Sequence, residues 1–71
     1  MNKEELFRIA EVHYSEMLKT NTFVSDPDYF RFPLQLPHYK TVFVTVNGGK
    51  IKQIEIHYEN GGIQTIRPDP V

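Results

Sequence analysis

The 71-residue chain is long enough for one small domain and too short to enclose a large enzyme cleft by itself. Eight Lys and Arg residues against nine Asp and Glu leave a formal charge of −1, so the basic excess of most nucleic-acid-binding domains is missing. Because the chain has no cysteine, neither a disulfide nor a cysteine-ligated zinc ion can support its core. We therefore expect a single domain over residues 1–71 that packs its apolar side chains very efficiently or covers some of them with another chain.

Residues 3–19 have the apolar spacing of an amphipathic helix. Asn2 is suited to cap the first turn, and Glu5 three residues later completes a capping-box pattern. At about 100° per residue, six apolar side chains gather within roughly 120° of the helix circumference. They are Leu6, Phe7, Ala10, Tyr14, Met17 and Leu18. Ile9 and Val12 lie outside this arc, so a single helix packed on a single sheet would leave both of them in water.

The stretch between residues 20 and 40 is long for a connection without regular structure. The aspartates on either side of Pro27 have the pattern of a helix start and predict a single helical turn over residues 28–30. From residue 30 to residue 36, aromatic and aliphatic residues alternate with polar residues and prolines, which indicates an extended segment. Since Pro33 cannot donate a backbone hydrogen bond, we expect this segment at the edge of a sheet.

Residues 41–46 and 51–58 are alternating, β-branched segments around the turn sequence Asn-Gly-Gly-Lys, which predicts a hairpin. With a three-residue loop over 48–50, the valines of the first segment share one face of the sheet with the isoleucines of the second. The predicted pairs are Val46 with Lys52, Val44 with Ile54 and Val42 with Ile56. In this register Phe43 lies on the outer face of the sheet, away from the helix.

A second turn over residues 60–62 leads into a third strand at 63–67, and its Asn-Gly sequence is a strong hairpin signal. The two isoleucines of this strand are three residues apart, so it needs either a bulge or one outward isoleucine. The prolines that follow end the pairing and give residues 68–71 an extended tail. Together the elements predict an α+β fold, with one N-terminal amphipathic helix packed on a three-stranded antiparallel β-meander (α-β-β-β). The Pro- and aromatic-rich extended connection is a candidate edge strand.

No group of residues has the spacing of a catalytic or metal-binding motif. His13, His38 and His57 are never paired at helical i,i+4 spacing, and no carboxylate lies at a metal-motif offset from any of them. Ser15 and Ser25 lie outside any nucleophile-elbow sequence, and both glycine pairs join strands instead of preceding a helix. We expect no metal, no cofactor and no enzymatic activity. An enzyme assembled between subunits, with His38 or His57 as its base, has no positive support.

The remaining charged residues are expected to be solvated. Glu55 and Glu59 lie four residues apart on one strand, about 13 Å, which is too far for paired acid–base work. We therefore expect Glu55 to pair across the strands with Arg67. Residues 1–5 are charged and carry no apolar signal-peptide core, and no apolar run approaches the ~20 residues of a membrane span. A cytoplasmic protein without membrane contact is the expectation.

Aromatic residues gather around an arginine at residues 29–32, which we call the aromatic segment. It consists of Tyr29, Phe30, Arg31 and Phe32. Such rings close the end of an undersized core, enter protein interfaces or stack on nucleobases. Core packing is the first expectation and a protein interface the second, because the neighbouring aspartates disfavour a nucleic acid.

Ile9, Val12 and Phe43 form a second apolar set, which the expected fold leaves uncovered. Exposure of all three on so small a chain favours association with another chain. The leading hypothesis is a non-enzymatic protein-interaction module, homodimeric, that acts as a small regulator or inhibitor of a larger protein. The protein partner is expected to bind the aromatic segment and Phe43, while Ile9 and Val12 serve self-association. The alternative is a single-stranded nucleic-acid-binding protein that uses the rings of Tyr29–Phe32.

Overall fold

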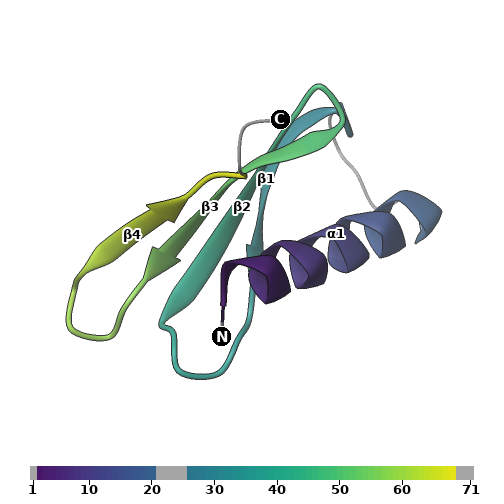
Figure 1. The fold of residues 1–71 in the computed structure, drawn as a ribbon. Helices are drawn as coiled ribbons and strands as arrows, with labels where there is room; N and C mark the ends of the chain where they lie inside the picture. The colour runs from purple at the N-terminus through teal and green to yellow at the C-terminus, as the bar shows by residue number, and fades with distance from the viewer. Residues whose placement is uncertain (1, 21–25, 69–71) are drawn as a thin grey trace.

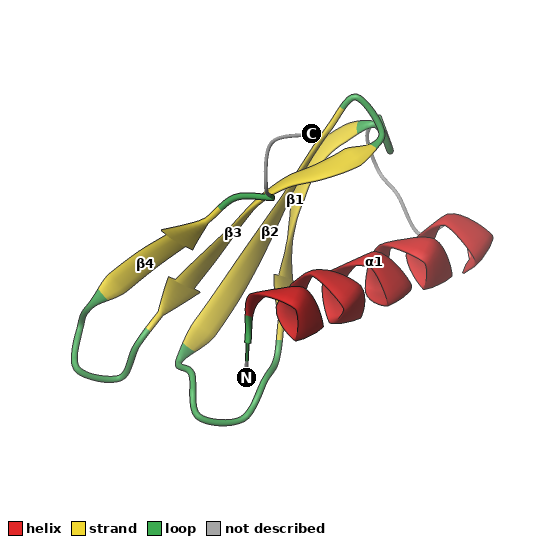
Figure 2. Ribbon diagram, in the orientation of Figure 1, coloured by secondary structure: helices red, strands yellow, loops and turns green. Residues whose placement is uncertain are grey.

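One helix lies across one face of a four-stranded antiparallel sheet in the computed structural model, which describes residues 2–20 and 26–68 (Figure 1). The elements are helix α1 (Lys3–Thr20) and strands β1 (Tyr29–Leu34), β2 (Thr41–Asn47), β3 (Lys50–His57) and β4 (Ile63–Ile66). The strand order is β1-β2-β3-β4, so every strand pairs with its neighbour in the chain (Figure 2). The expected α+β fold is confirmed, and the candidate edge strand is present as β1. Ser25 and the predicted tail beyond Pro68 lie outside the described residues.

Helix α1 begins where the sequence predicts. The backbone N–H of Glu5 donates to the side-chain oxygen Oδ1 of Asn2 at 2.9 Å, and the N–H of Leu6 donates to the Asn2 carbonyl oxygen at 3.1 Å. The Asn2 side chain therefore satisfies one amide group that the first turn would otherwise leave without a partner, and the Asn2 carbonyl accepts the first regular hydrogen bond of the helix. The buried side chains of the helix are Leu6, Ala10 and Tyr14, all of which point at the sheet.

The chain enters β1 through a turn, so the predicted helical turn over residues 28–30 is wrong. Asp26 accepts two backbone hydrogen bonds, from the N–H of Asp28 to its Oδ1 at 2.9 Å and from the N–H of Tyr29 to its carbonyl oxygen at 3.2 Å. The aspartate side chain thus stabilises a turn in place of a helix start. The next residues gain cross-strand pairing with β2, in which Phe32 lies opposite Val44.

The β2–β3 hairpin confirms two of its three predicted pairs, Val44 with Ile54 and Val42 with Ile56. The prediction that Val46 lies opposite Lys52 is wrong, because Val46 pairs with Ile51. The turn has two residues instead of three: Gly48 and Gly49 adopt positive φ angles of 65° and 77°, as a type I′ turn requires. A bulge next to Val46 leaves Lys52 unpaired and turns Ile51 toward the core, which adds one more buried aliphatic side chain.

Strand β4 resolves the conflict between its two isoleucines by turning one of them outward. Ile63 is 61% exposed, whereas Ile66 packs against the core. Ile66 lies opposite Ile54 on the face of the sheet that packs against α1, and Ile63 lies opposite His57 on the outer face. Regular alternation is therefore kept, and the cost is one exposed isoleucine at the edge of the sheet.

The core lies between α1 and the inner face of the sheet, and all the described charged side chains stay outside it. Its members are Leu6, Ala10, Tyr14, Phe32, Leu34, Val42, Val44, Val46, Ile51, Ile54 and Ile56. Phe32 is 3% exposed, and its ring stacks on those of Tyr14 and His13 at centroid distances of 6.4 and 5.6 Å. The alternation of β1 therefore assigns this ring to the core.

Phe32→Ala tests this assignment. The substitution is expected to lower the free energy of unfolding by about 3–5 kcal/mol, because loss of the ring leaves a cavity between α1 and the sheet. Tyr29→Ala on the same strand removes a ring that is 59% exposed, and it is expected to cost about 0.5 kcal/mol or less. Urea unfolding followed by circular dichroism measures both changes. Equal effects of the two variants would contradict the packing described above.

Candidate functional site

The sheet has a second face, opposite α1, that no other element within residues 2–20 and 26–68 covers (Figure 2). We call it the open face. Because successive side chains of a strand alternate, the pairing of the strands assigns about half of the sheet residues to it. They are Tyr29, Arg31, Pro33, Thr41, Phe43, Thr45, Asn47, Lys50, Gln53, Glu55, His57, Ile63 and Thr65. Phe43 lies on the outer side, as predicted, and is half-buried there among its neighbours.

Four side chains from three strands meet at the centre of the open face, and we call them the Phe43 cluster. The guanidinium carbon of Arg31 lies 4.7 Å from the centroid of the Phe43 ring. The same guanidinium donates from Nη2 to Glu55 Oε2 at 3.1 Å. His57 Nε2 lies 3.1 Å from the other carboxylate oxygen of Glu55, and its ring meets the Phe43 ring edge-on at 5.4 Å. Each member of the cluster is therefore held by at least two others.

The contacts of the Phe43 cluster show that one predicted ion pair, between Glu55 and Arg67, is wrong. Glu55 was expected to pair with Arg67, but its carboxylate is shared between Arg31 and His57. The guanidinium of Arg67 instead donates from Nη2 to Gln53 Oε1 at 3.4 Å, which places Arg67 over the open face as well. Strand β4 ends at Ile66, one residue before Arg67, so Arg67 is no cross-strand neighbour of Glu55.

The open face is positively charged although the whole chain is not. Arg31, Lys50 and Arg67 stand against the single carboxylate of Glu55, so this face carries a formal charge of about +2 with His57 counted as neutral. The formal charge of the chain is −1. The excess of negative charge therefore lies elsewhere, partly in the four glutamates of α1.

The aromatic segment does not form one surface, because neighbouring residues of β1 point to opposite faces of the sheet. Tyr29 and Arg31 lie on the open face, where Arg31 meets Phe43. Phe30 and Phe32 point toward the helix, and the Phe30 ring lies 5.8 Å from that of Tyr14. The prediction that Phe32 contacts a partner is therefore wrong, since its side chain belongs to the core. The nucleic-acid alternative loses the same buried ring.

The partner site predicted from the sequence did not include Glu55 and His57, which both belong to the Phe43 cluster. Both lie on the outer side of β3, where the sequence places them, and the direct pairing of Phe43 with Glu55 follows from the predicted register. The sequence pattern that predicts their involvement is an aromatic residue on one strand paired with a carboxylate on the next strand, followed two residues later by a histidine on the same face. The involvement of Arg31 could not be found in this way, because it depends on the pairing of β1 with β2.

The two residues predicted for self-association differ in exposure. Ile9 is half-buried and packs against the core, whereas Val12 is 58% exposed. A shallow hollow of about 280 Å³ next to both of them is lined by Arg8, Ile9, Val12, His13 and Glu16. Its walls combine two aliphatic side chains with charges of both signs.

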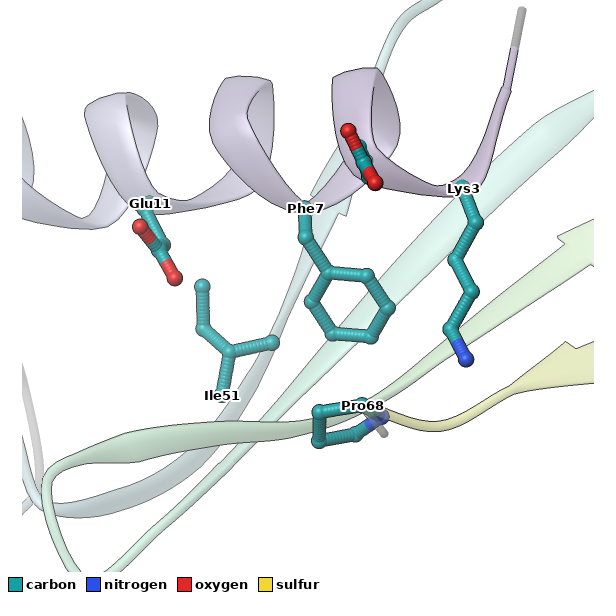
Figure 3. Close-up of a pocket in the computed structure, with 6 residues that line it drawn as sticks. Lys3, Phe7, Glu11, Ile51 and Pro68 are labelled. Atoms are coloured by element: carbon teal, nitrogen blue, oxygen red, sulfur yellow. The ribbon is translucent and has the colours of Figure 1, made fainter. Parts of the chain in front are cut away.

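A second hollow, of about 220 Å³, opens between the first turns of α1 and strand β3 (Figure 3). The ring of Phe7 points from the helix toward Ile51 and Pro68, and Lys3 and Glu11 flank it on either side (Figure 3). Glu4 completes the lining. The lining therefore combines apolar side chains with one ammonium and two carboxylate groups.

The three histidines lie on separate elements of the fold. His13 stacks on Phe32 from the helix side, and His57 belongs to the Phe43 cluster on the opposite face. His38 lies in the β1–β2 connection, with a positive φ of 75°. Within the described ranges, no group of three or more His, Cys, Asp or Glu residues is arranged to hold a metal ion.

No known protein family, curated protein or solved structure matches the chain. The interpretation of the site therefore depends on its own geometry. In the part of the chain that the structure describes, no helix combines the length and the apolar character needed to cross a membrane.

Tyr14 connects α1 to the turn that leads into β1. Its hydroxyl donates a hydrogen bond to the carbonyl oxygen of Pro27 at 2.8 Å. Burial, and then the negative charges of Asp28 and Asp26, raise the pKa of the Tyr14 hydroxyl above its ordinary value of 10.0. Because the ionised form is disfavoured, the hydroxyl remains a donor at neutral pH and holds the strand that carries Arg31 against the helix.

Tyr14→Phe tests this connection at alkaline pH. Since the pKa of Tyr14 is higher in the folded chain than in the unfolded chain, its stabilising effect is complete below about pH 10 and is lost as the pH rises through the folded pKa. The free energy of unfolding of the wild type is therefore expected to fall more steeply above about pH 10 than that of Tyr14→Phe. Urea titrations at a series of pH values measure the two curves. Parallel curves would show that Tyr14 ionises equally in both states.

Proposed function

We propose that the chain is a cytoplasmic, non-enzymatic protein-interaction module that binds a larger protein through its open face and forms a homodimer. The observation that carries the proposal is the Phe43 cluster. Its side chains are held together by an ion pair, a histidine contact and ring contacts on a face that the helix leaves uncovered. Such contacts are not needed for the core, which lies on the other side of the sheet.

The chemistry of the open face suits a protein partner. Arginine and aromatic residues are enriched where protein interfaces bind most tightly, and here Arg31, Phe43 and Tyr29 share one face. The guanidinium of Arg31 is already fixed on the ring and on Glu55, so a partner orders few additional side chains when it binds. The excess positive charge favours a partner surface with acidic residues around an apolar contact.

A nucleic-acid strand is less suited to this face. The Phe43 ring already has the guanidinium of Arg31 over it, so a base could stack there only by displacing that contact. A small protein that covers part of a larger protein acts most directly by blocking access to it, so regulation or inhibition is the role we propose.

Site-specific photo-crosslinking in the native host tests the proposal. A benzophenone side chain at position 29, on the open face, is expected to capture one larger protein that mass spectrometry identifies. The same group at position 59 lies in the turn after β3 and serves as the control. Equal capture of the same proteins from both positions would contradict a specific site on the open face.

With the captured protein in hand, two variants of the cluster measure its contribution. Phe43→Ala and Arg31→Ala are each expected to weaken binding by at least about tenfold, or roughly 1.4 kcal/mol, as central aromatic and arginine contacts do. Thr45→Ala, on the same strand and face but outside the cluster, is the matched control and is expected to change binding by less than about threefold. Titration calorimetry measures all three. Unchanged binding of both cluster variants, with folding verified by circular dichroism, would refute the proposed site.

A further inference from the structure

The side of α1 that points away from the sheet carries a stripe of aliphatic and charged side chains, which we call the outer helix stripe. At about 100° per residue, its members fall within roughly 100° of the circumference, opposite the buried side chains of the helix. They are Glu5, Arg8, Ile9, Val12, Glu16 and Lys19. Ile9 lies at the margin of the stripe, where it is half-buried and packs against the core. Val12, which is 58% exposed, lies near the middle of the stripe.

The charges of the stripe are arranged with opposite signs about Val12. Arg8 lies four residues before it and Glu16 four residues after it, while Glu5 and Lys19 lie seven residues before and after. When two identical helices pair antiparallel around a two-fold axis, a residue before the axis faces the residue at the same distance after it. With Val12 on the axis, Arg8 faces Glu16 of the second copy, and Glu5 faces its Lys19. In a parallel pair each charge would face its own kind.

We propose that two copies of the chain associate through the outer helix stripe, antiparallel, with Val12 on the two-fold axis. The inference rests on the self-association included in the proposed function and names the surface and orientation that produce it. Glu5, Val12 and Lys19 recur every seven residues, so at about 100° per residue they lie within roughly 40° of one another on the helix. The stretch from Glu5 to Lys19 spans about 21 Å at 1.5 Å per residue, which is long enough for four pairs of charges to engage.

The hollow beside Val12 supports the same arrangement. It is lined by Arg8, Ile9, Val12 and Glu16 together with His13, so an aliphatic side chain that enters it meets Ile9 and Val12 between charges of both signs. The existing contact between Lys19 and Glu16 is long, at 3.6 Å, and both side chains are largely exposed. Such a pair contributes little to the stability of the single chain and can exchange for contacts with a second copy.

The arrangement has a consequence for the open face. The helix and the open face lie on opposite sides of the sheet (Figure 1), so a dimer joined through α1 leaves both open faces uncovered. The dimer can therefore engage two copies of a protein partner, or two sites on one partner, which raises the overall affinity without any new contact.

Charge-swapped variants at positions 8 and 16 test the inference by sedimentation equilibrium. With two aliphatic residues per copy on the seam, the wild-type dimer is expected to be weak, with a dissociation constant on the order of 100 µM. Arg8→Glu and Glu16→Arg alone each create two like-charge contacts and are expected to weaken the dimer by at least about tenfold. An equimolar mixture of the two variants restores opposite charges at both contacts, and so does the double variant. The dimer dissociation constants of the mixture and of the double variant are each expected to lie within about threefold of the wild-type value.

Two controls separate a specific contact from general repulsion and from misfolding. Lys52→Glu changes the net charge as Arg8→Glu does, at an exposed position on β3, and is expected to leave dimerisation unchanged. Val12→Glu places one carboxylate from each copy at the two-fold axis, where the two repel each other, and is expected to abolish the dimer. Circular dichroism verifies that each variant is folded, which is expected because the substituted side chains are exposed.

The outcomes distinguish this inference from the proposed function. A wild-type chain that stays monomeric up to about 1 mM overturns both the self-association and the helix pairing, and leaves the open face as a partner site. A dimer that survives both Arg8→Glu and Val12→Glu keeps the self-association and overturns the helix stripe as its surface. Single variants that dissociate and do not recover on mixing overturn the antiparallel orientation.

Discussion

A single helix can cover only one face of a sheet, and the rest of this structure depends on that constraint. The side chains of Leu6, Ala10 and Tyr14 form one core with the buried side chains that β1, β2 and β3 turn toward α1. Because strand side chains alternate, each residue that enters the core commits its neighbours to the opposite face. The open face is therefore a direct consequence of building the core, and it is where the chain can place side chains that the core does not need.

The open face is organised even though nothing described covers it. Phe43 and His57 are half-buried by their own neighbours, and Arg31 is fixed between the Phe43 ring and Glu55. Exposed ion pairs of this kind contribute little to stability, since water and salt screen them. Their effect is to hold a small number of rings and charges in one geometry, which lowers the entropic cost of recognising another surface.

Composition conceals how the charges are distributed. A formal charge of −1 argues against a basic patch, yet the fold gathers Arg31, Lys50 and Arg67 on the open face with one carboxylate among them. The outer side of α1 carries both signs in an order that is complementary to itself. Two faces of one small domain thus have different electrostatic properties, and we propose an acidic protein surface as the partner of one and a second copy of the chain as the partner of the other.

Local patterns in the sequence determined the helix and its Asn2 cap, the two hairpins, the α+β class and the outer position of Phe43, because each depends on periodicity or on a few adjacent residues. Tertiary structure alone decided the rest. Whether Lys52 or Ile51 lies opposite Val46 was decided by the bulge next to Val46, which turns Ile51 toward the core. The pairing of β1 with β2 separated the aromatic segment into buried and exposed halves and brought Arg31 to Phe43 and Glu55. Contacts between residues far apart in the chain follow from packing, which no short stretch of sequence contains.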